Sequence, residues 1–177
     1  MKINKGDTLE EISLPKPDGS IFNLSETKGK KVLLTFYRIA GCSFCNLRLN
    51  ELNKRFSEFG NNFTHVGIFH SPVDNLKSYM DKHGELPFTV LADENFEYFK
   101  KYEVEQSIWK FLVGSTVGFF KILRATAKGY FPMEINGMTI VPVDILINEK
   151  GIIEKVYYGK NTTDHLSFEE IRDFSLS

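Results

Sequence analysis

Five apolar runs along the chain have the length and the branched or aromatic content of buried β-strands. A short turn ending at Gly151 separates the last two runs, so we expect them to form an antiparallel hairpin. The pattern predicts a central sheet built from residues 32–37, 63–69, 87–92, 140–147 and 152–158.

Helical signals alternate with these strands. Apolar residues recur at three- and four-residue spacing over residues 42–59 and line one face of an amphipathic helix. A serine and a proline at 71 and 72 open a second helix, which a glycine ends at 84. An acidic residue at 93 or 94 starts a third. A capping box over residues 167–170 opens a C-terminal helix whose inward residues are Ile171 and Phe174.

The N-terminal segment precedes the first buried strand. Its residues 15–19 read Pro-Lys-Pro-Asp-Gly, which is turn chemistry between two short apolar pieces. We expect residues 9–14 and 21–24 to form a hairpin, or a loop with edge strands, that covers the sheet.

Residues 107–128 are unusually rich in apolar side chains. Lys110 and Lys121 interrupt the run well short of the roughly 20 residues that a membrane span requires, and Gly114 and Gly118 lower its helix propensity. We expect this segment to form one or more amphipathic helices that pack into the protein beside the active site. The alternatives are a partner or dimer surface and the wall of an apolar substrate pocket.

Length, charge and the N-terminus narrow the class of protein. The 177 residues suit a single domain over residues 1–177, and the formal net charge of -1 gives no basic excess for a nucleic-acid partner. The first residues lack the apolar core of a signal peptide, and two cysteines do not make a disulfide framework. A reducing cytoplasm is the expected location.

The first strand leads directly to the only two cysteines, Cys42 and Cys45, in a C-x-x-C sequence at the predicted helix start. Unpaired backbone N–H groups and the helix dipole favour a thiolate there. In such sites the first cysteine titrates at about 3.5 to 7.5 instead of about 8.5. We therefore expect Cys42 to be an exposed nucleophile with a low pKa and Cys45 to be the resolving thiol.

Two other interpretations of the cysteines remain, half of a zinc site and structural thiols. Zinc needs four ligands, and none of the four histidines lies at ligand spacing from another. We accordingly expect no metal and no cofactor.

Charged and imidazole side chains near the cysteines are the further candidates. Arg38 is expected either to stabilise the thiolate or to form a surface ion pair. Arg48, two turns into the helix, is expected to be solvated. His70 ends the second strand and His165 lies in the loop before the last helix, where each could support acid–base chemistry.

The order of elements, with the C-x-x-C helix and a proline at 142 before the late hairpin, resembles the thioredoxin fold. Residues 29–37, and the R-x-x-x-C-x-x-C sequence of residues 38–45, are similar to the peroxiredoxin branch of the alkyl hydroperoxide reductase and thiol-specific antioxidant (AhpC/TSA) superfamily. The C-terminal half adds similar pieces at 146–151, 158–159 and 164–165.

This resemblance implies an α/β thioredoxin-like fold: a central mixed sheet flanked by helices, a peroxiredoxin-type N-terminal extension, and a helical insertion before the strand at Pro142. It implies a cis bond before Pro142, which would stand across a groove from Cys42 and leave the backbone of Val141 free to pair with a substrate strand.

The function that the resemblance implies is a thiol-based antioxidant oxidoreductase cycling between a Cys42–Cys45 dithiol and disulfide. A disulfide oxidoreductase without peroxidase activity and a redox-sensing binding module are the alternatives. The expected partners are a thioredoxin-type or glutathione reductant, a peroxide or disulfide substrate and, in one version, a second copy of the chain.

Overall fold

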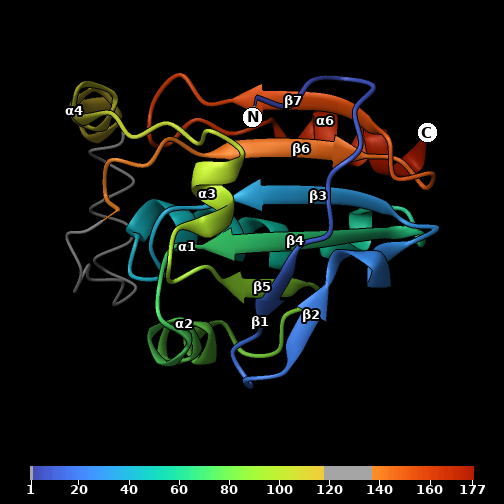
Figure 1. The fold of residues 1–177 in the computed structure, drawn as a ribbon, viewed down its shortest axis with the longest axis horizontal. Helices are drawn as coiled ribbons and strands as arrows, with labels where there is room; N and C mark the ends of the chain where they lie inside the picture. Colours follow the sequence, from blue (N-terminus) through green and yellow to red (C-terminus); the bar gives the residue numbers. More distant parts are fainter. Residues whose placement is uncertain (1, 118–136) are drawn as a thin grey trace.

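A five-stranded mixed sheet forms the centre of the computed structural model, which describes residues 2–117 and 137–177 (Figure 1). The strand order is β5-β4-β3-β6-β7. Strands β3, β4 and β5 run parallel, whereas β6 pairs antiparallel with both β3 and β7. The strands are β3 (Lys31–Phe36), β4 (Phe63–Phe69), β5 (Thr89–Ala92), β6 (Val143–Ile147) and β7 (Ile153–Tyr158).

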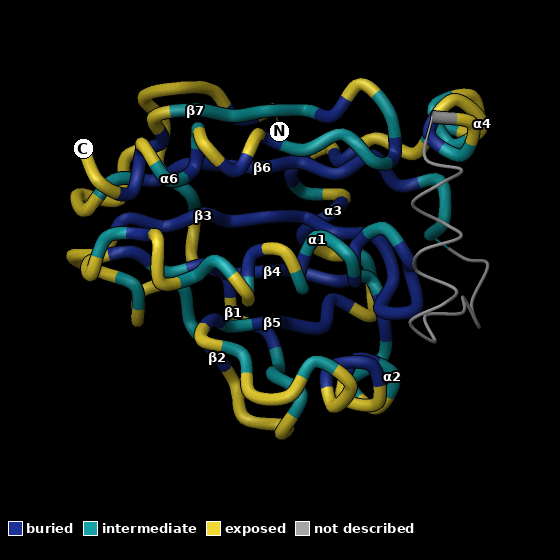
Figure 2. The backbone as a smooth tube through the Cα atoms, turned by 180° about the vertical axis from the view of Figure 1, so that it is seen from behind, coloured by how far each residue is buried: buried dark blue, intermediate teal, exposed yellow. Residues whose placement is uncertain are grey.

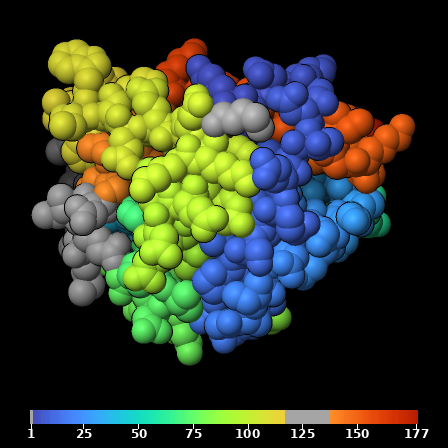
Figure 3. Space-filling model, viewed as in Figure 1, coloured from blue at the N-terminus to red at the C-terminus, as the bar shows by residue number. Residues whose placement is uncertain are grey.

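Apolar side chains cover both faces of this sheet. One buried cluster lies between the sheet and the helices α1 (Ser43–Lys54), α2 (Val73–Met80) and α6 (Phe168–Leu176). The second cluster lies on the other face, under the N-terminal residues and α3 (Glu97–Lys101). Figure 2 shows the first face with α1 and α6 in front, and in Figure 3 the N-terminal residues and α3 cover the second. The predicted thioredoxin-like α/β arrangement is confirmed.

The N-terminal extension is the predicted hairpin. Strands β1 (Ser13–Pro15) and β2 (Ile21–Asn23) pair antiparallel, and a 3₁₀ turn, η1 (Leu24–Thr27), follows them. The buried side chains of Leu14 and Phe22 join the second apolar cluster. Two further 3₁₀ turns, η2 (Phe56–Glu58) and η3 (Asp81–His83), end the segments after α1 and α2.

The C-terminal helix also begins as its sequence predicts. Ser167 is the N-cap of α6, and its Oγ accepts a hydrogen bond from the backbone N–H of Glu170 at 3.2 Å. Ile171 and Phe174 are buried in the first apolar cluster. Residues 163–167, which lead into this helix, line a cleft beside α1. The cap therefore fixes the helix end that borders this cleft.

Helix α4 (Ile108–Val117) overturns the expectation of buried packing. Ile108 and Trp109 are 71% and 74% exposed, and Leu112 is exposed as well. Gly114 is buried, because it lies directly against Thr162. The predicted segment continues to residue 128, and its part from 118 onwards lies outside the described residues. In the described ranges, every helix is too short or too polar to cross a membrane.

Candidate active site

The Cys42 sulfur lies at the N-terminus of α1, where two donors point at it. Cys42 is the N-cap residue, and its Sγ accepts a hydrogen bond from the backbone N–H of Cys45 at 3.1 Å. The Nη2 group of Arg38 donates a second at 2.8 Å. Burial acts to raise the pKa of Cys42, but hydrogen bonds from Cys45 and the Arg38 charge outweigh it and lower that pKa to about 6.

Cys45 has the opposite electrostatic situation. Burial raises the pKa of the Cys45 thiol well above its usual range, and the neighbouring Cys42 sulfur raises it further. Cys42 is therefore the thiolate of the pair and Cys45 the protonated thiol. Both side chains are almost fully buried, at 1% and 2% exposure, so the expectation of an exposed nucleophile is wrong. Phe44 and Met138 pack against the apolar cluster that encloses them.

Arg38 contacts the thiolate and is no part of a surface ion pair. The residue is 1% exposed, and its Nη1 group donates to the backbone carbonyl of Met138 at 2.8 Å. Its guanidinium carbon lies 5.4 Å from the ring centroid of Phe44, within cation–π range. Its Nε has no hydrogen-bond partner among the residues that the structure describes. Arg38 thus joins Cys42 to the segment at 138.

Two polar side chains hold the turn that precedes Cys42. Ser71 Oγ accepts from the backbone N–H of Ala40 at 2.9 Å. Asn46 Nδ2 donates to the carbonyls of Ala40 and Cys42 at 2.7 and 2.9 Å, and His83 Nε2 lies 2.7 Å from Asn46 Oδ1. Sequence reasoning missed Asn46, although an asparagine directly after the C-x-x-C, on the buried side of the helix, is a signal that could have found it.

A layer of buried polar groups lies on the α1 side of the sheet. His65 donates from Nδ1 to the Leu33 carbonyl at 3.0 Å, which leaves Nε2 to accept from the Tyr37 hydroxyl at 3.1 Å. Burial lowers the pKa of His65 to about 4. The Tyr37 ring also lies 5.6 Å from that of His165, centroid to centroid. The Nδ1 atom of His165 lies 3.1 Å from the carboxylate of Asp144.

Asp144 stands inside the otherwise apolar strand β6. Burial acts to raise its pKa, but the charge and hydrogen bond of His165 and the backbone N–H of Leu166 lower that pKa to about 2. Thr35 also donates to the carboxylate at 2.8 Å. A single acidic residue within a run of Val, Ile and Leu is the signal that sequence reasoning overlooked.

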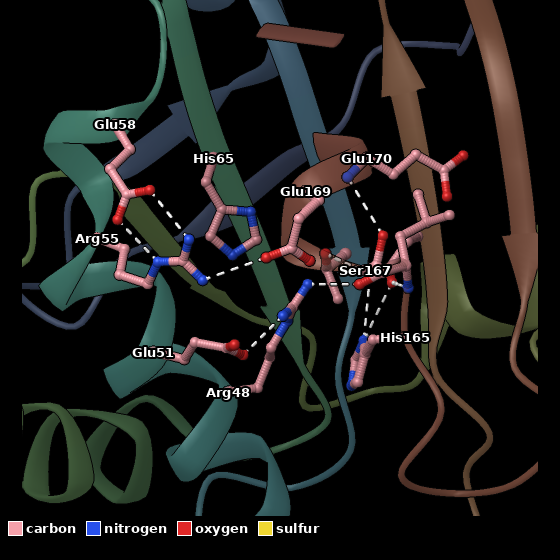
Figure 4. A network of polar contacts seen from close by, with 12 residues as sticks. Arg48, Glu51, Arg55, Glu58, His65, His165, Ser167, Glu169 and Glu170 are labelled. Carbon is pink, nitrogen blue, oxygen red and sulfur yellow. Dashed lines mark hydrogen bonds and ion pairs between the residues drawn. The ribbon is translucent and has the colours of Figure 1, made fainter. Parts of the chain in front are cut away.

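Arg48 is not solvated as expected. Its side chain is 11% exposed, and it donates to the Glu51 carboxylate and to the Leu166 carbonyl, both at 2.7 Å. Figure 4 shows this arginine between α1 and the segment that carries His165. An open cleft of about 680 Å³ runs along the same boundary, and Phe44 lies at its edge.

The remaining candidates are His70, whose backbone N–H donates to the Arg38 carbonyl at 2.9 Å, and Pro142. His70 Nδ1 lies 3.2 Å from the Asp93 carbonyl, and its ring packs edge-on to that of Phe96. The peptide bond before Pro142 is trans, so the expected cis bond is wrong. The backbone N–H of Val141 donates to the Glu105 carbonyl at 2.8 Å, and therefore the strand-pairing position that was expected to be free is already occupied.

In the part of the chain that the structure describes, no group of three or more His, Cys, Asp or Glu side chains is arranged to hold a metal ion. The two cysteines form no disulfide, and the Cys42 sulfur faces Arg38 and Cys45. The chemistry this arrangement offers is that of a stabilised thiolate next to a second thiol.

Comparison with known proteins identifies relatives of this chain. The model of the AhpC/TSA family matches residues 5–156. Peroxiredoxin Q, chloroplastic, of Populus jackii is 30% identical over 116 residues, which are 64% of this chain and 53% of that protein. The chain thus spans about half the length of such chloroplastic relatives. Peroxiredoxin Bcp of Escherichia coli K12 is 29% identical over 170 residues, 92% of this chain and 90% of that protein.

Two solved structures show the same fold. The peroxiredoxin-like protein from Aquifex aeolicus superposes with a TM-score of 0.71 at 13% identity, over 98% of this chain and 86% of that one. Peroxidoxin BcpB from Mycobacterium tuberculosis gives 0.65 at 18% identity, over 90% and 88%. The sequence match identifies the family, and these structures share the fold.

Proposed function

Because this chain belongs to the AhpC/TSA family, we propose that it is a thiol-dependent peroxidase that cycles between a Cys42–Cys45 dithiol and disulfide. The observation that carries the proposal is the Cys42 sulfur, held 2.8 Å from Arg38 Nη2 with its pKa lowered to about 6. A thiolate is the nucleophilic form of cysteine, and at neutral pH this group is ionised.

The proposed reaction has two steps at Cys42. Its thiolate attacks one peroxide oxygen, the O–O bond breaks, and the leaving oxygen takes a proton to become water or an alcohol. Cys42 is then a sulfenic acid. The Cys45 thiol attacks the Cys42 sulfur, the S–O bond breaks, and water leaves as the disulfide forms. An external thiol reductant restores the dithiol by exchange.

Arg38 is proposed to serve the first step in two ways. Its charge stabilises the Cys42 thiolate before attack, and its Nε, which has no partner among the described residues, offers one more donor for a peroxide oxygen. A fixed donor of this kind stabilises the negative charge that develops as the O–O bond breaks. Pro142, by contrast, is proposed only to begin β6, since Val141 already pairs with Glu105.

A peroxide-consumption assay with the reduced full chain tests the proposal. Hydrogen peroxide and an alkyl hydroperoxide are supplied with dithiothreitol. Cys42→Ser should reduce consumption to the background rate. Cys45→Ser should still form one sulfenic acid per chain, trapped with dimedone, because only the resolving step is lost. Reduction of insulin disulfides by a chain that consumes no peroxide would replace this function with that of a disulfide oxidoreductase.

Partners and location are further parts of the proposal. A thioredoxin-type or glutathione system would supply the electrons in a cytoplasmic setting, where both cysteines can remain thiols between cycles. Residues 1–177 would act as one domain. Exposed Ile108, Trp109 and Leu112 on α4 support a homodimer through that helix. Light scattering at several concentrations tests this, with Trp109→Ser as the comparison. A wild-type chain that stays a monomer at every concentration would contradict a dimer through α4.

A further inference from the structure

Asn46 is a fully buried polar residue of helix α1. It follows Cys45 directly and is 0% exposed. Its Nδ2 group uses both of its hydrogens, one for the Ala40 carbonyl at 2.7 Å and one for the Cys42 carbonyl at 2.9 Å. A buried amide keeps such a position only when its hydrogen bonds are satisfied, so these contacts account for the presence of Asn46.

The orientation of the Asn46 amide follows from its neighbours. Two carbonyl oxygens can be contacted only by the NH₂ group, so Oδ1 must point the other way. There it meets Nε2 of His83 at 2.7 Å, and this nitrogen must carry a hydrogen to donate. His83 lies in η3, after α2 and 37 positions along the chain from Asn46. Asn46 thereby ties the cysteine turn to a separate part of the fold.

The turn that Asn46 holds determines where the Cys42 sulfur lies. The Ala40 and Cys42 carbonyls flank Gly41, and both accept from the same side chain. The sulfur depends on that backbone, because its donors lie at 2.8 Å on Arg38 and 3.1 Å on the Cys45 backbone. Hydrogen bonds weaken steeply with poor distance and angle, and therefore a small rotation of the turn would lose one or both.

We propose that Asn46 is a positioning residue for the Cys42 sulfur and that His83 orients the Asn46 amide. The inference rests on the proposed function, since Cys42 is taken to be the reacting group. The Asn46 side chain donates to the backbone carbonyls of Ala40 and Cys42. It acts through the backbone of residues 40–42.

The test is the pH profile of Cys42 alkylation in the reduced full chain. Iodoacetamide is the probe, and mass spectrometry assigns the modified cysteine. Asn46→Ala should raise the apparent pKa of Cys42 by at least about one unit, so alkylation at pH 5 falls about tenfold. His83→Ala should shift the profile in the same direction by a smaller amount. His83→Gln should restore it, because a glutamine amide can donate to Oδ1 as the imidazole does.

Matched controls separate positioning from general damage. Asn50→Ala removes an asparagine one turn further along α1, at the edge of the cleft, and should leave the Cys42 profile unchanged. A folded Asn46→Ala chain with the wild-type profile would overturn the inference, as would His83→Gln behaving like His83→Ala. If Asn46→Ala does not fold, the two His83 variants decide by the same criteria.

The readout keeps the two proposals apart, since alkylation needs no peroxide. If the Asn46 and His83 variants show the shifted profiles but the wild-type chain consumes no peroxide, the role of Asn46 is supported and the peroxidase is overturned. A chain that consumes peroxide and whose Asn46 and His83 variants keep the wild-type profile would overturn the role of Asn46 alone.

Discussion

At the scale of single residues, one ion pair dominates the site. A buried guanidinium without an anion is costly, and so is a buried thiolate without a cation. Arg38 and Cys42 supply the opposite charge to each other, with Arg38 Nη2 2.8 Å from Cys42 Sγ. The sequence places them four residues apart across a turn, but spacing alone could not tell whether Arg38 would face inward. The Met138 carbonyl that fixes the other end of its guanidinium lies 100 positions away in the chain.

Arg38→Met should raise the pKa of Cys42, because it removes the charge while keeping a long side chain. We expect alkylation at pH 5 to fall at least about tenfold, since below the pKa each unit of pKa changes the thiolate fraction by that factor. Absorbance of the thiolate at 240 nm across the pH range measures it directly. Arg38→Lys is the control: it keeps the charge without the second hydrogen bond and should lie between the two. An unchanged titration in Arg38→Met would show that Arg38 does not lower the pKa of Cys42.

The same group makes the stability of the reduced protein depend on pH. The pKa of Cys42 is about 6 in the folded chain and about 8.5 in an unfolded one, so the unfolded state binds more protons between these values. Stability should therefore rise from pH 6 to pH 8 by about 1.4 kcal/mol per unit at most, and be lost as the pH falls through 6. Urea unfolding with a phosphine reductant measures this. Cys42→Ser should flatten the slope, and an equal slope in that variant would assign it to other groups.

At the scale of elements, the pattern of apolar residues predicts the strands and most helices well. Strand β4 begins and ends at the residues expected, and α6 begins after the expected N-cap, Ser167. Propensity and periodicity are local properties, and these elements obey them. Helix α4 forms, but its apolar side chains are exposed instead of buried. An apolar segment is usually buried, and the local sequence does not tell whether the same chain or a partner covers it. The bond before Pro142 likewise depends on its surroundings, since Val141 pairs with Glu105.

Gly114 fixes α4 against the loop before α6. Alanine normally favours a helix over glycine by about 1 kcal/mol, but here its Cβ would overlap Oγ1 of Thr162. We expect Gly114→Ala to destabilise the protein by about 1–3 kcal/mol, measured as a lower urea midpoint at constant slope. Thr162→Ala should cost little by itself, because its buried Oγ1 has no partner among the described residues. The double substitution should then recover part of the loss. A stabilised Gly114→Ala chain would show that α4 is not held at this point.

At the scale of the whole molecule, the topology brings together residues that the sequence keeps far apart. The antiparallel pairing of β3 with β6 sets Asp144 beside Thr35, and the segment before α6 adds His165. Sequence reasoning identified the C-x-x-C, Arg38 and the fold, because local patterns carry them. It could not find the Asp144–His165 pair or the Asn46–His83 contact, since each joins two elements that only the folded chain brings into contact.

The bridge from Arg38 to Cys42 also bears on how readily the protein gives up or takes electrons. Forming the disulfide removes the thiolate charge and leaves the buried guanidinium facing neutral sulfur, so the bridge stabilises only the reduced form. A redox couple whose reduced form is selectively stabilised has a higher reduction potential, and about 30 mV corresponds to about 1.4 kcal/mol for two electrons. We expect the potential to lie above the value of about −270 mV typical of thioredoxin. Equilibration in glutathione buffers measures it, and Arg38→Met should lower it; an equal or higher potential in that variant would contradict this account. By this reasoning, the arginine that activates Cys42 toward an oxidant also makes the resulting disulfide easier for a thiol reductant to open.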